Sequence, residues 1–372
     1  MDKVFIEKCS EYKNSKNALL SILSNFECLK KINSKSKVLI KANLVSALPP
    51  EKGATTNYLL LSFLVDFLKN KGAKVVIGDS PGGLYNKSHL DHIYKITKMN
   101  ETGAELNYNF GIKNTSNNKA MFLKNFDYTS YIDDYDFKIN FCKLKTHAMM
   151  KMSASVKNLY GTIPGLTKSE YHYRFPNHDD FANMLIDINE YFKFDLNIVD
   201  AIIGMDGNGP TMGNPKKIGS IIASTNPYAL DYICAKVINL NPSSVNTIVQ
   251  SEKRGLFNHN EIILNEDINK FITKDFELIE NAIDIKFYNH SLVGNVISKV
   301  FENKPYCDKN SCIKCQKCKN ICPKKAITME KGYPVIDREK CIKCYCCQEF
   351  CPVGAMRVKT NILNKIINRR FK

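Results

Sequence analysis

The chain has 372 residues, of which 53 are Lys or Arg and 37 are Asp or Glu, so its formal net charge is +16. This length suits two or three domains, and an apolar fraction of 44% excludes a disordered or fibrous chain. No apolar run reaches the roughly 18 residues of a membrane span, and the first residues lack the apolar core of a secretory signal. We therefore expect a cytoplasmic protein whose 14 cysteines are metal ligands or free thiols rather than disulfides.

Apolar segments of strand length alternate with helical patterns through the first 240 residues. Alternating strands and helices are typical of parallel sheets, and strands that are apolar along their whole length have both faces covered. We therefore predict an α/β domain over residues 1–303, built on a mostly parallel sheet with helices on both faces. Strands are predicted at Val38–Leu44, Lys74–Gly78, Phe137–Leu144, Leu196–Met205 and Ile218–Ser224. Helices are predicted at Thr55–Lys71, Phe181–Phe192 and Pro227–Leu240.

Polar or glycine-rich segments follow four of the predicted strands. Because the carboxyl ends of parallel strands meet at one edge of a sheet, we expect these segments to form a single cleft. Lysines there would bind a carboxylate or phosphate, and a helix N-terminus at Thr55 would add N–H donors. The alternative is that a lysine-rich chain places solvated lysines at loop ends, and that Asp79 forms a turn. The candidate substrate-binding residues are Lys41, Asn43, Thr55, Thr56, Asp79, Lys143, Lys157 and Asp206.

Three residues, His147, His172 and Lys145, are candidates for catalysis. Imidazole titrates near neutral pH, so either histidine could transfer protons while Lys145 holds the substrate. The histidines could instead be metal ligands or hydrogen-bonded structural residues. Neither a dinucleotide-binding glycine pattern nor a phosphate-binding Gly-Lys-Ser/Thr loop is present, so nucleotide cofactors are not supported, and a flavin or a further metal is left open. Cys142 is more simply explained as a buried thiol than as a nucleophile.

Ten of the 14 cysteines lie between Cys307 and Cys351, mostly in two segments of the same spacing. Each segment reads Cys, two residues, Cys, two residues, Cys, three residues, Cys-Pro, and the second repeats the first with an offset of 29 residues. This is the bacterial pattern for [4Fe–4S] clusters, in which the fourth Cys of each run binds the other cluster. A zinc site would need paired cysteines without the third Cys and the Cys-Pro. The pattern predicts Cys312, Cys315, Cys318 and Cys351 on one cluster, and Cys341, Cys344, Cys347 and Cys322 on the other.

Two other cysteines of this region are not predicted ligands. Cys346 takes the place of Lys317 in the first run, so we expect a free thiol there, and Cys307 lies outside the repeat. Between the runs, Glu330-Lys331-Gly332 indicates the turn of a β-hairpin. The basic tail, residues 359–372, has a helical apolar face, and we expect it to pack on the N-terminal domain rather than to contact a membrane surface.

Seven segments resemble, in order and spacing, successive motifs of the family called domain of unknown function 362, and the resemblance covers residues 36–240. The segments are Lys41–Leu44, Ala54–Thr56, Gly78–Gly82, Lys143–His147, Val156–Gly161, Tyr171–His172 and Gly204–Pro210. The family usually has Pro where this chain has Ala42, a change that loosens the loop but keeps Lys41 and Asn43. Residues 304–358 resemble a bacterial two-cluster ferredoxin domain, to which this family is often fused. That resemblance implies transfer of single electrons at low potential, and a distant relationship in fold to nickel-dependent lactate racemase is also expected.

The fusion of an electron relay to a domain with clustered polar loops favours an iron–sulfur oxidoreductase. In this interpretation two [4Fe–4S] clusters pass low-potential electrons to a small anionic substrate in the cleft, and a redox partner protein supplies them. One alternative is an electron carrier or partner-binding protein without a substrate of its own. Another is a non-redox enzyme whose clusters are structural or sensory. The basic residues are dispersed and no nucleic-acid motif is present, so no nucleic-acid partner is expected.

Overall fold

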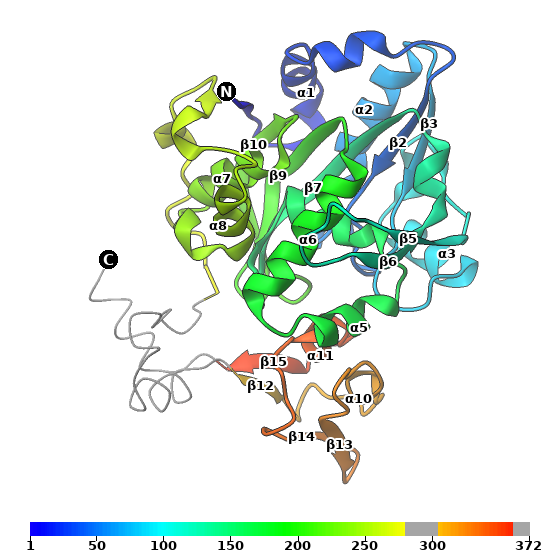
Figure 1. Ribbon diagram of the computed structural model, residues 1–372, viewed down its shortest axis with the longest axis vertical. Helices are drawn as coiled ribbons and strands as arrows, with labels where there is room; N and C mark the ends of the chain where they lie inside the picture. The colour runs from blue at the N-terminus through cyan, green and yellow to red at the C-terminus, as the bar shows by residue number, and fades with distance from the viewer. Residues whose placement is uncertain (280–303, 360–372) are drawn as a thin grey trace.

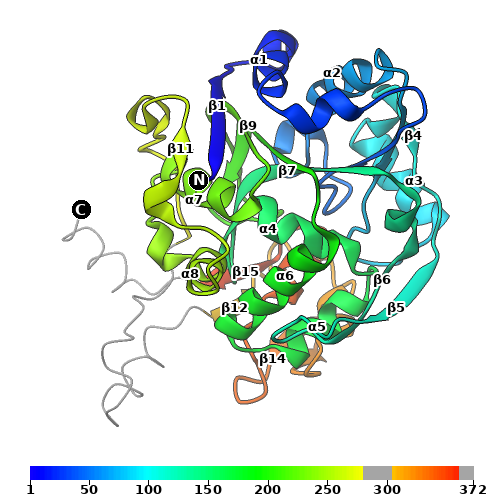
Figure 2. The ribbon, with the colours of Figure 1, turned by 45° about the horizontal axis from the view of Figure 1, so that its top comes forward.

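The computed structural model describes residues 1–279 and 304–359, and a nine-stranded sheet forms its larger part (Figure 1). The strands of this sheet are β1 (Lys3–Lys8), β2 (Lys37–Lys41), β3 (Lys74–Gly78), β4 (Glu105–Leu106), β7 (Phe137–His147), β8 (Lys151–Ser153), β9 (Leu196–Asp206), β10 (Asn214–Ser224) and β11 (Ile263–Leu264). Their order is β11-β1-β10-β9-β7-β2-β3-β4, with β8 paired to the end of β7, so that β11 and β4 lie at opposite edges (Figure 2). The strands from β9 to β4 are parallel, whereas β10 lies antiparallel between β9 and β1.

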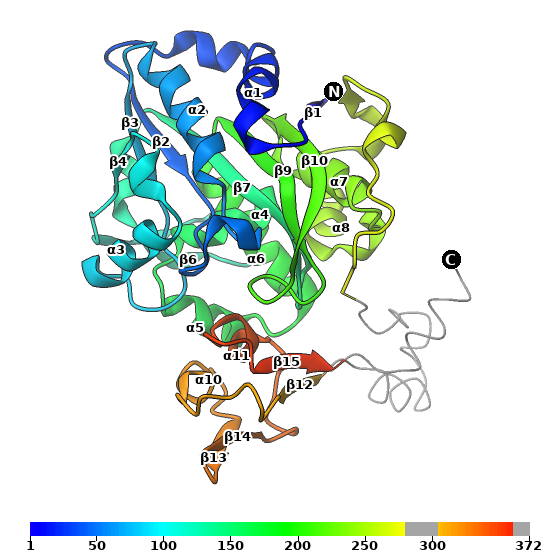
Figure 3. The ribbon, with the colours of Figure 1, turned by 180° about the vertical axis from the view of Figure 1, so that it is seen from behind.

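Helices cover both faces of the sheet (Figures 1 and 3). One face carries α1 (Ser15–Leu23), α2 (Tyr58–Lys69) and α3 (Lys87–Ile96). The other carries α4 (Ser155–Asn158), α6 (His178–Phe192), α7 (Pro227–Val237) and α8 (Asn246–Lys253). A further helix, α5 (Thr167–Arg174), lies at the carboxyl end of the sheet, and β5 (Ile112–Ser116) pairs with β6 (Asn125–Thr129) outside it. The predicted α/β class, with a mostly parallel sheet between helices, is confirmed.

The main differences from the sequence-based prediction lie at element ends. The helix predicted from Thr55 begins at Tyr58, because the side chain of Asn57 accepts a hydrogen bond from the Leu59 N–H and caps it there. The strand predicted to end at Leu144 continues to His147, because its last residues pair with β8. The strand predicted from Ile218 begins at Asn214 and is antiparallel to β9, so the two form a long hairpin.

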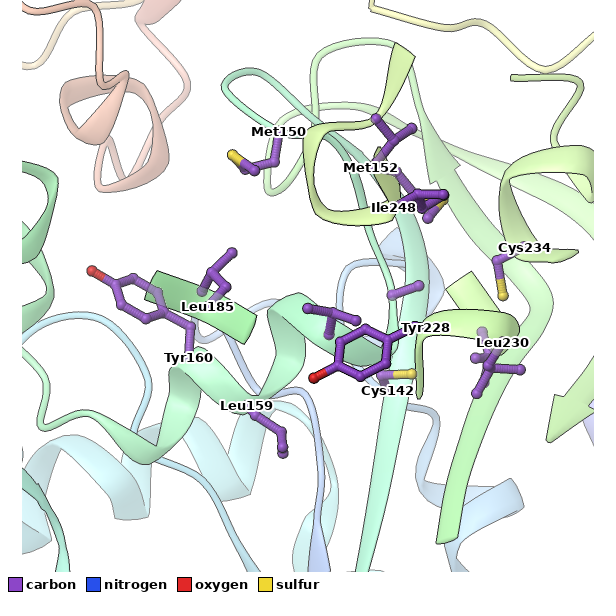
Figure 4. Packing of buried hydrophobic residues seen from close by; sticks show 14 of the residues in the cluster. Cys142, Met150, Met152, Leu159, Tyr160, Leu185, Tyr228, Leu230, Cys234 and Ile248 are labelled. Carbon is purple, nitrogen blue, oxygen red and sulfur yellow. The ribbon is translucent and has the colours of Figure 1, made fainter. Parts of the chain in front are cut away.

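Two apolar cores hold the helices onto the sheet. The larger lies beneath α4, α6, α7 and α8, and it contains both Cys142 and Cys234 as buried thiols (Figure 4). Burial raises the pKa of the Cys142 thiol well above its usual value, so this thiol stays protonated at neutral pH. The second core joins α1, α2 and α3 to the opposite face. Cys142 therefore packs as a small apolar residue, in agreement with the interpretation of the sequence.

The cysteine-rich segment forms a small C-terminal domain at the carboxyl end of the sheet, where α11 lies against the α5 region in both Figures 1 and 3. Its elements are β12 (Lys304–Cys307), α10 (Lys317–Asn320), β13 (Ile327–Glu330), β14 (Tyr333–Ile336), α11 (Cys346–Glu349) and β15 (Met356–Lys359). β12 pairs with β15, and β13 and β14 form the predicted hairpin. The predicted domain boundary at 303/304 coincides with the edge of a described range. The predicted packing of the tail, residues 359–372, lies almost entirely outside the described residues. Within those limits, no helix has the length and apolar character needed to span a membrane.

Candidate functional site

A cavity of about 860 Å³ lies at the carboxyl ends of the parallel strands, where the sequence predicts a cleft. The α/β domain contributes Lys41, Asp79, Lys145 and Lys157 to its wall, from four different segments. The C-terminal domain closes the other side with residues of both cysteine runs, among them Cys351. The cavity is therefore shared between the polar strand ends and the cysteine-rich domain.

Lys41 and Asp79 form a buried ion pair in this wall. The Lys41 ammonium lies 2.7 Å from Asp79 Oδ1 and donates to Asn158 Oδ1 at 3.0 Å. Burial lowers the pKa of Lys41, and the Asp79 carboxylate opposes that shift. Asn43 joins the same network, because its Nδ2 donates to Asn158 Oδ1 at 2.7 Å. A pair held in this way fixes the geometry of the wall and adds little net charge to it.

The backbone at Gly161 passes directly over this pair, since a Cβ there would collide with Asp79 Oδ1 and Lys41 Nζ. We expect Gly161→Ala to displace the pair, to lower stability by about 1–3 kcal/mol through overpacking, and to weaken anion binding in the cavity. Thermal unfolding and calorimetric titration with a carboxylate would measure the two effects. Gly255→Ala is a suitable control. Its φ of +68° should make the substitution lower stability by about 1–2 kcal/mol, but nothing lies within 4 Å of the added Cβ. An unchanged affinity in Gly161→Ala would contradict the expectation.

Three lysines of the wall have no carboxylate within 4.0 Å among residues 1–279 and 304–359. Of these, Lys317 is exposed, whereas Lys145 and Lys168 are not. Lys145 donates to Asn43 Oδ1 at 2.8 Å and to the Ala54 carbonyl at 2.7 Å. Lys168, which the sequence analysis missed, donates to the carbonyls of Ser80 and Ile163. Burial, with repulsion by neighbouring lysines, lowers the pKa of each to about 7. These two side chains are the cations that an entering anion would neutralise.

The affinity of the cavity for anions is therefore expected to fall as the pH is raised from 6 to 9. Only the protonated lysine attracts an anion, and both Lys145 and Lys168 lose their protons around pH 7 in the ligand-free protein. A bound anion stabilises the protonated form, so the decline begins somewhat above that value. Calorimetric titration of a simple carboxylate at several pH values would measure it. An affinity that does not change over this range would show that neither lysine binds the anion.

Glu349 of α11 carries the negative charge that the C-terminal domain brings to the cavity, where Lys317 also lies. Its carboxylate lies 3.8 Å from Lys157 Nζ and 3.2 Å from His147 Nε2. Burial alone would raise the pKa of Glu349, but the Lys157 charge and the His147 hydrogen bond bring it below the usual range. Glu349 is not among the residues predicted from the sequence, since nothing in its local sequence predicts partners about 200 residues away.

His147 is a docking residue rather than the acid–base group proposed from the sequence. Its Nδ1 accepts hydrogen bonds from the N–H groups of Met149 and Met150, so Nε2 carries the proton that is donated to Glu349. Burial lowers the pKa of His147 to about 4, and the ring is neutral at pH 7. It does not line the cavity. The extension of β7 to His147 places the ring at the domain contact.

His172 does line the cavity, but it is also uncharged. Its ring stacks on Phe181 with centroids 4.5 Å apart, and Tyr160 meets it edge-on. Burial lowers the pKa of His172 to about 3, and Nδ1 has no hydrogen-bond partner in the described part of the chain. Burial thus keeps both rings uncharged near pH 7, and a role of His172 in proton transfer stays a prediction.

Four predicted binding residues lie away from the cavity. Lys143 is fully buried and pairs with Asp200 at 2.8 Å, because β7 continues past it and leaves it inside the sheet rather than at its tip. Thr56 hydrogen-bonds the backbone of Asn43 and Phe141, and Thr55 is buried beside it. The Asp206 carboxylate accepts from the Glu277 N–H. Asn57, and not Thr55, caps the helix that follows, so the predicted N–H donors at Thr55 are absent from the wall.

The loop after β9, predicted to carry substrate chemistry, binds the C-terminal domain and also lines the cavity with Pro210, Thr211 and Met212. Gln348 Nε2 donates to Asn208 Oδ1 at 2.7 Å, and the Thr211 hydroxyl approaches the Glu349 carbonyl at 3.5 Å. The ring of Phe350 lies against Gly82, where an added Cβ would come within 2.6 Å of it. These contacts hold α11 over the strand ends and so fix the position of the second cysteine run.

The predicted cluster ligands surround two small cavities in the C-terminal domain. One cavity is lined by Cys312, Cys315, Cys318 and Cys351, and by no other cysteine. The other is lined by Cys322, Cys341, Cys344 and Cys347, with Cys346 beside them. Among the described residues, no three His, Cys, Asp or Glu side chains lie close enough to hold a single metal ion, whereas a cube binds its four thiolates through four separate irons. The two sets of thiols therefore fit the donor chemistry of [4Fe–4S] clusters, and the pairing of ligands stays a prediction.

The backbone of the two cysteine runs adopts the same unusual conformation at matching positions. Lys314 and Gln316 in the first run, and Lys343 and Tyr345 in the second, have φ between 56° and 60°. Non-glycine residues rarely take this left-handed conformation, which turns successive N–H groups toward one point. The Lys314 N–H lies 3.4 Å from Cys312 Sγ, and the Ala326 and Met356 N–H groups similarly face the sulfurs of Cys322 and Cys351. Such hydrogen bonds stabilise thiolates and tune the potential of a bound cluster.

Comparisons with known proteins agree with this division of the chain. The model of the domain of unknown function DUF362 matches residues 38–236, and that of a 4Fe-4S dicluster domain matches residues 311–355. A thylakoid-associated protein of Synechocystis sp. is 28% identical over 227 residues, which cover 59% of this chain and 68% of that protein.

Two solved structures show weaker similarity. The lactate racemase apoprotein of Thermoanaerobacterium thermosaccharolyticum matches 64% of this chain with 11% identity and a TM-score of 0.40. A protein from Thermotoga maritima matches 59% of this chain with 11% identity and a TM-score of 0.36. In each case the match spans 57% of the solved chain. Residues 38–236 are more than half of the sequence, so the chain belongs to the DUF362 family, and it is an iron–sulfur protein with a C-terminal 4Fe-4S ferredoxin domain.

Proposed function

We propose that the protein is an oxidoreductase in which two [4Fe–4S] clusters deliver low-potential electrons to an anionic substrate in the shared cavity. The observation that carries this proposal is that Cys351, a predicted ligand of the first cluster, lines the same cavity as Lys41, Lys145 and Lys168. A substrate held by the lysines would lie beside a cluster ligand. Bound clusters would supply one-electron transfer, each losing one electron and regaining it from a low-potential donor protein.

The residues of the chain have separate parts in this proposal. Lys145 and Lys168 bind the anion, and the Lys41–Asp79 pair with Asn43 keeps the wall rigid. The docking contacts of Glu349 with His147 and Lys157 hold the cluster domain against the cavity. Because Lys145 and Lys168 each have a pKa of about 7, they are also the groups best suited to give a proton to the reduced substrate at neutral pH.

Anaerobic reoxidation tests the proposal. The holoprotein would be reduced with dithionite, freed of excess reductant and mixed with a panel of anionic acceptors, while visible absorbance reports the clusters. The expected result is that at least one acceptor reoxidises both clusters, and that Lys145→Met slows this step without slowing reduction by dithionite. Clusters that reduce but are never reoxidised by any acceptor would contradict the proposal. Capture of a stoichiometric redox partner, with Lys145→Met leaving that exchange intact, would favour an electron carrier instead.

A further inference from the structure

The size of the shared cavity exceeds what a small anion needs. Pockets of roughly 300–1,000 Å³ hold ligands of drug size, and this cavity of about 860 Å³ lies near the top of that range. A phosphate or acetate ion would fill only a small part of it. The ligand that suits the cavity therefore has a body as well as a charged group.

Charged and apolar residues occupy different parts of the wall. The lysines at the strand ends are buried, with Lys41 and Lys145 each 1% exposed. Two large apolar side chains of the wall, Leu84 and Leu166, are 59% and 51% exposed, although most apolar side chains of this size are buried. The lysines at the strand ends are therefore deep, and the two leucines lie toward the solvent, as does Lys317 of the C-terminal domain.

The C-terminal domain extends the apolar part of the wall. Ile321 and Phe350, the residues that directly follow α10 and α11, line the cavity. His172 also lines it and adds no positive charge, because burial keeps its ring neutral. Exposed apolar side chains gathered at the mouth of a cavity are a usual mark of a ligand-binding site.

From this arrangement we infer that the cavity binds an amphipathic organic anion, whose anionic head contacts Lys145 and Lys168 and whose apolar body lies along Leu84, Leu166 and Phe350. The inference rests on the proposed function, because it names the class of substrate for the same cavity. It also replaces the small anion predicted from the sequence with a larger one.

Binding of straight-chain carboxylates to the oxidised, cluster-loaded protein tests the inference without any turnover. Acetate, butanoate, hexanoate and octanoate would be titrated calorimetrically under anaerobic conditions. Burial of each CH₂ contributes about 0.8 kcal/mol, so affinity is expected to rise about fourfold per CH₂ along the series. Octylamine, with the same body and the opposite charge, is expected not to compete with octanoate. An affinity independent of chain length, or equal binding of octylamine, would overturn the inference.

Variants separate the two parts of the wall. Lys145→Met is expected to weaken all carboxylates by a similar factor, since it removes a contact to the common head group. Leu84→Ser combined with Leu166→Ser is expected to leave acetate unchanged and to flatten the dependence on chain length. Both leucines are exposed, so the double variant should fold normally. Unchanged chain-length dependence in that variant would contradict the placement of the apolar body.

The outcomes distinguish this inference from the proposed function. If octanoate binds as expected but no acceptor reoxidises the clusters, the binding inference stands and the redox proposal fails. If a small anion reoxidises the clusters and octanoate does not compete with it, the redox proposal stands and the inference is wrong.

Discussion

Cys351→Ala is expected to abolish the cluster held by the first cysteine run, although Cys351 belongs to the second. Iron and labile sulfide should fall from about eight to about four of each per chain, because only the cluster on the other four thiolates remains. The physical reason is the exchange of fourth ligands, which places Cys351 in the cavity of Cys312, Cys315 and Cys318. Iron analysis and electron paramagnetic resonance of the reduced protein would measure the loss.

Matched variants make this expectation specific. Cys312→Ala should remove the same resonance as Cys351→Ala, whereas Cys322→Ala should remove the other one. Cys346→Ala, at the buried thiol beside the second cavity, should retain both clusters. If Cys351→Ala instead gave the spectrum of Cys341→Ala, each run would bind its own cluster and the exchanged arrangement would be wrong.

Lys143→Met is expected to lower stability more, and Lys145→Met to lower anion affinity more, although the two lysines are only two residues apart. Lys143 pairs with Asp200 in the fully buried core, so its removal leaves an unpaired carboxylate and should cost about 3–5 kcal/mol of stability. Removal of the Lys145 side-chain amine leaves only two neutral acceptors without a donor, Asn43 Oδ1 and the Ala54 carbonyl. It should therefore lower stability by about 1–3 kcal/mol.

Anion binding should change in the reverse order. Loss of a charged hydrogen-bond donor contributes about 1.5–3 kcal/mol, so Lys145→Met should weaken a bound carboxylate by about 10- to 100-fold. Lys143→Met should leave the affinity of the folded protein unchanged. Denaturant unfolding and calorimetric titration would give the two quantities, and equal losses of affinity in both variants would show that Lys143 also reaches the ligand.

The sequence predicts those parts of the molecule that depend on local patterns. Apolar runs and helical periodicity identify the parallel core strands, and the cysteine spacing identifies the two ligand sets, because each pattern lies within a few neighbouring residues. The order of polar loops after strands also leads correctly to Lys41, Asn43, Asp79 and Lys145 in one cavity wall. Binding by these residues stays a prediction.

What sequence could not provide depends on strand ends and on contacts between distant segments. Lys143 and Lys145 look alike in sequence, and only the extension of β7 to His147 decides which one reaches the cavity. The docking of α11 gives His147 a carboxylate partner, and burial keeps its ring neutral by lowering its pKa. Lys168 lies in no recognisable pattern, and the fold alone brings it to the wall.

Anomalous diffraction from anaerobically grown crystals soaked in bromide would locate the clusters and the anion site together, since iron and bromide have distinct absorption edges. We expect iron in both cysteine-lined cavities of the C-terminal domain and a bromide ion at Lys145 and Lys168, in the cavity that Cys351 also lines. Iron in neither cavity, or bromide bound only at the outer surface of the protein, would contradict this expectation.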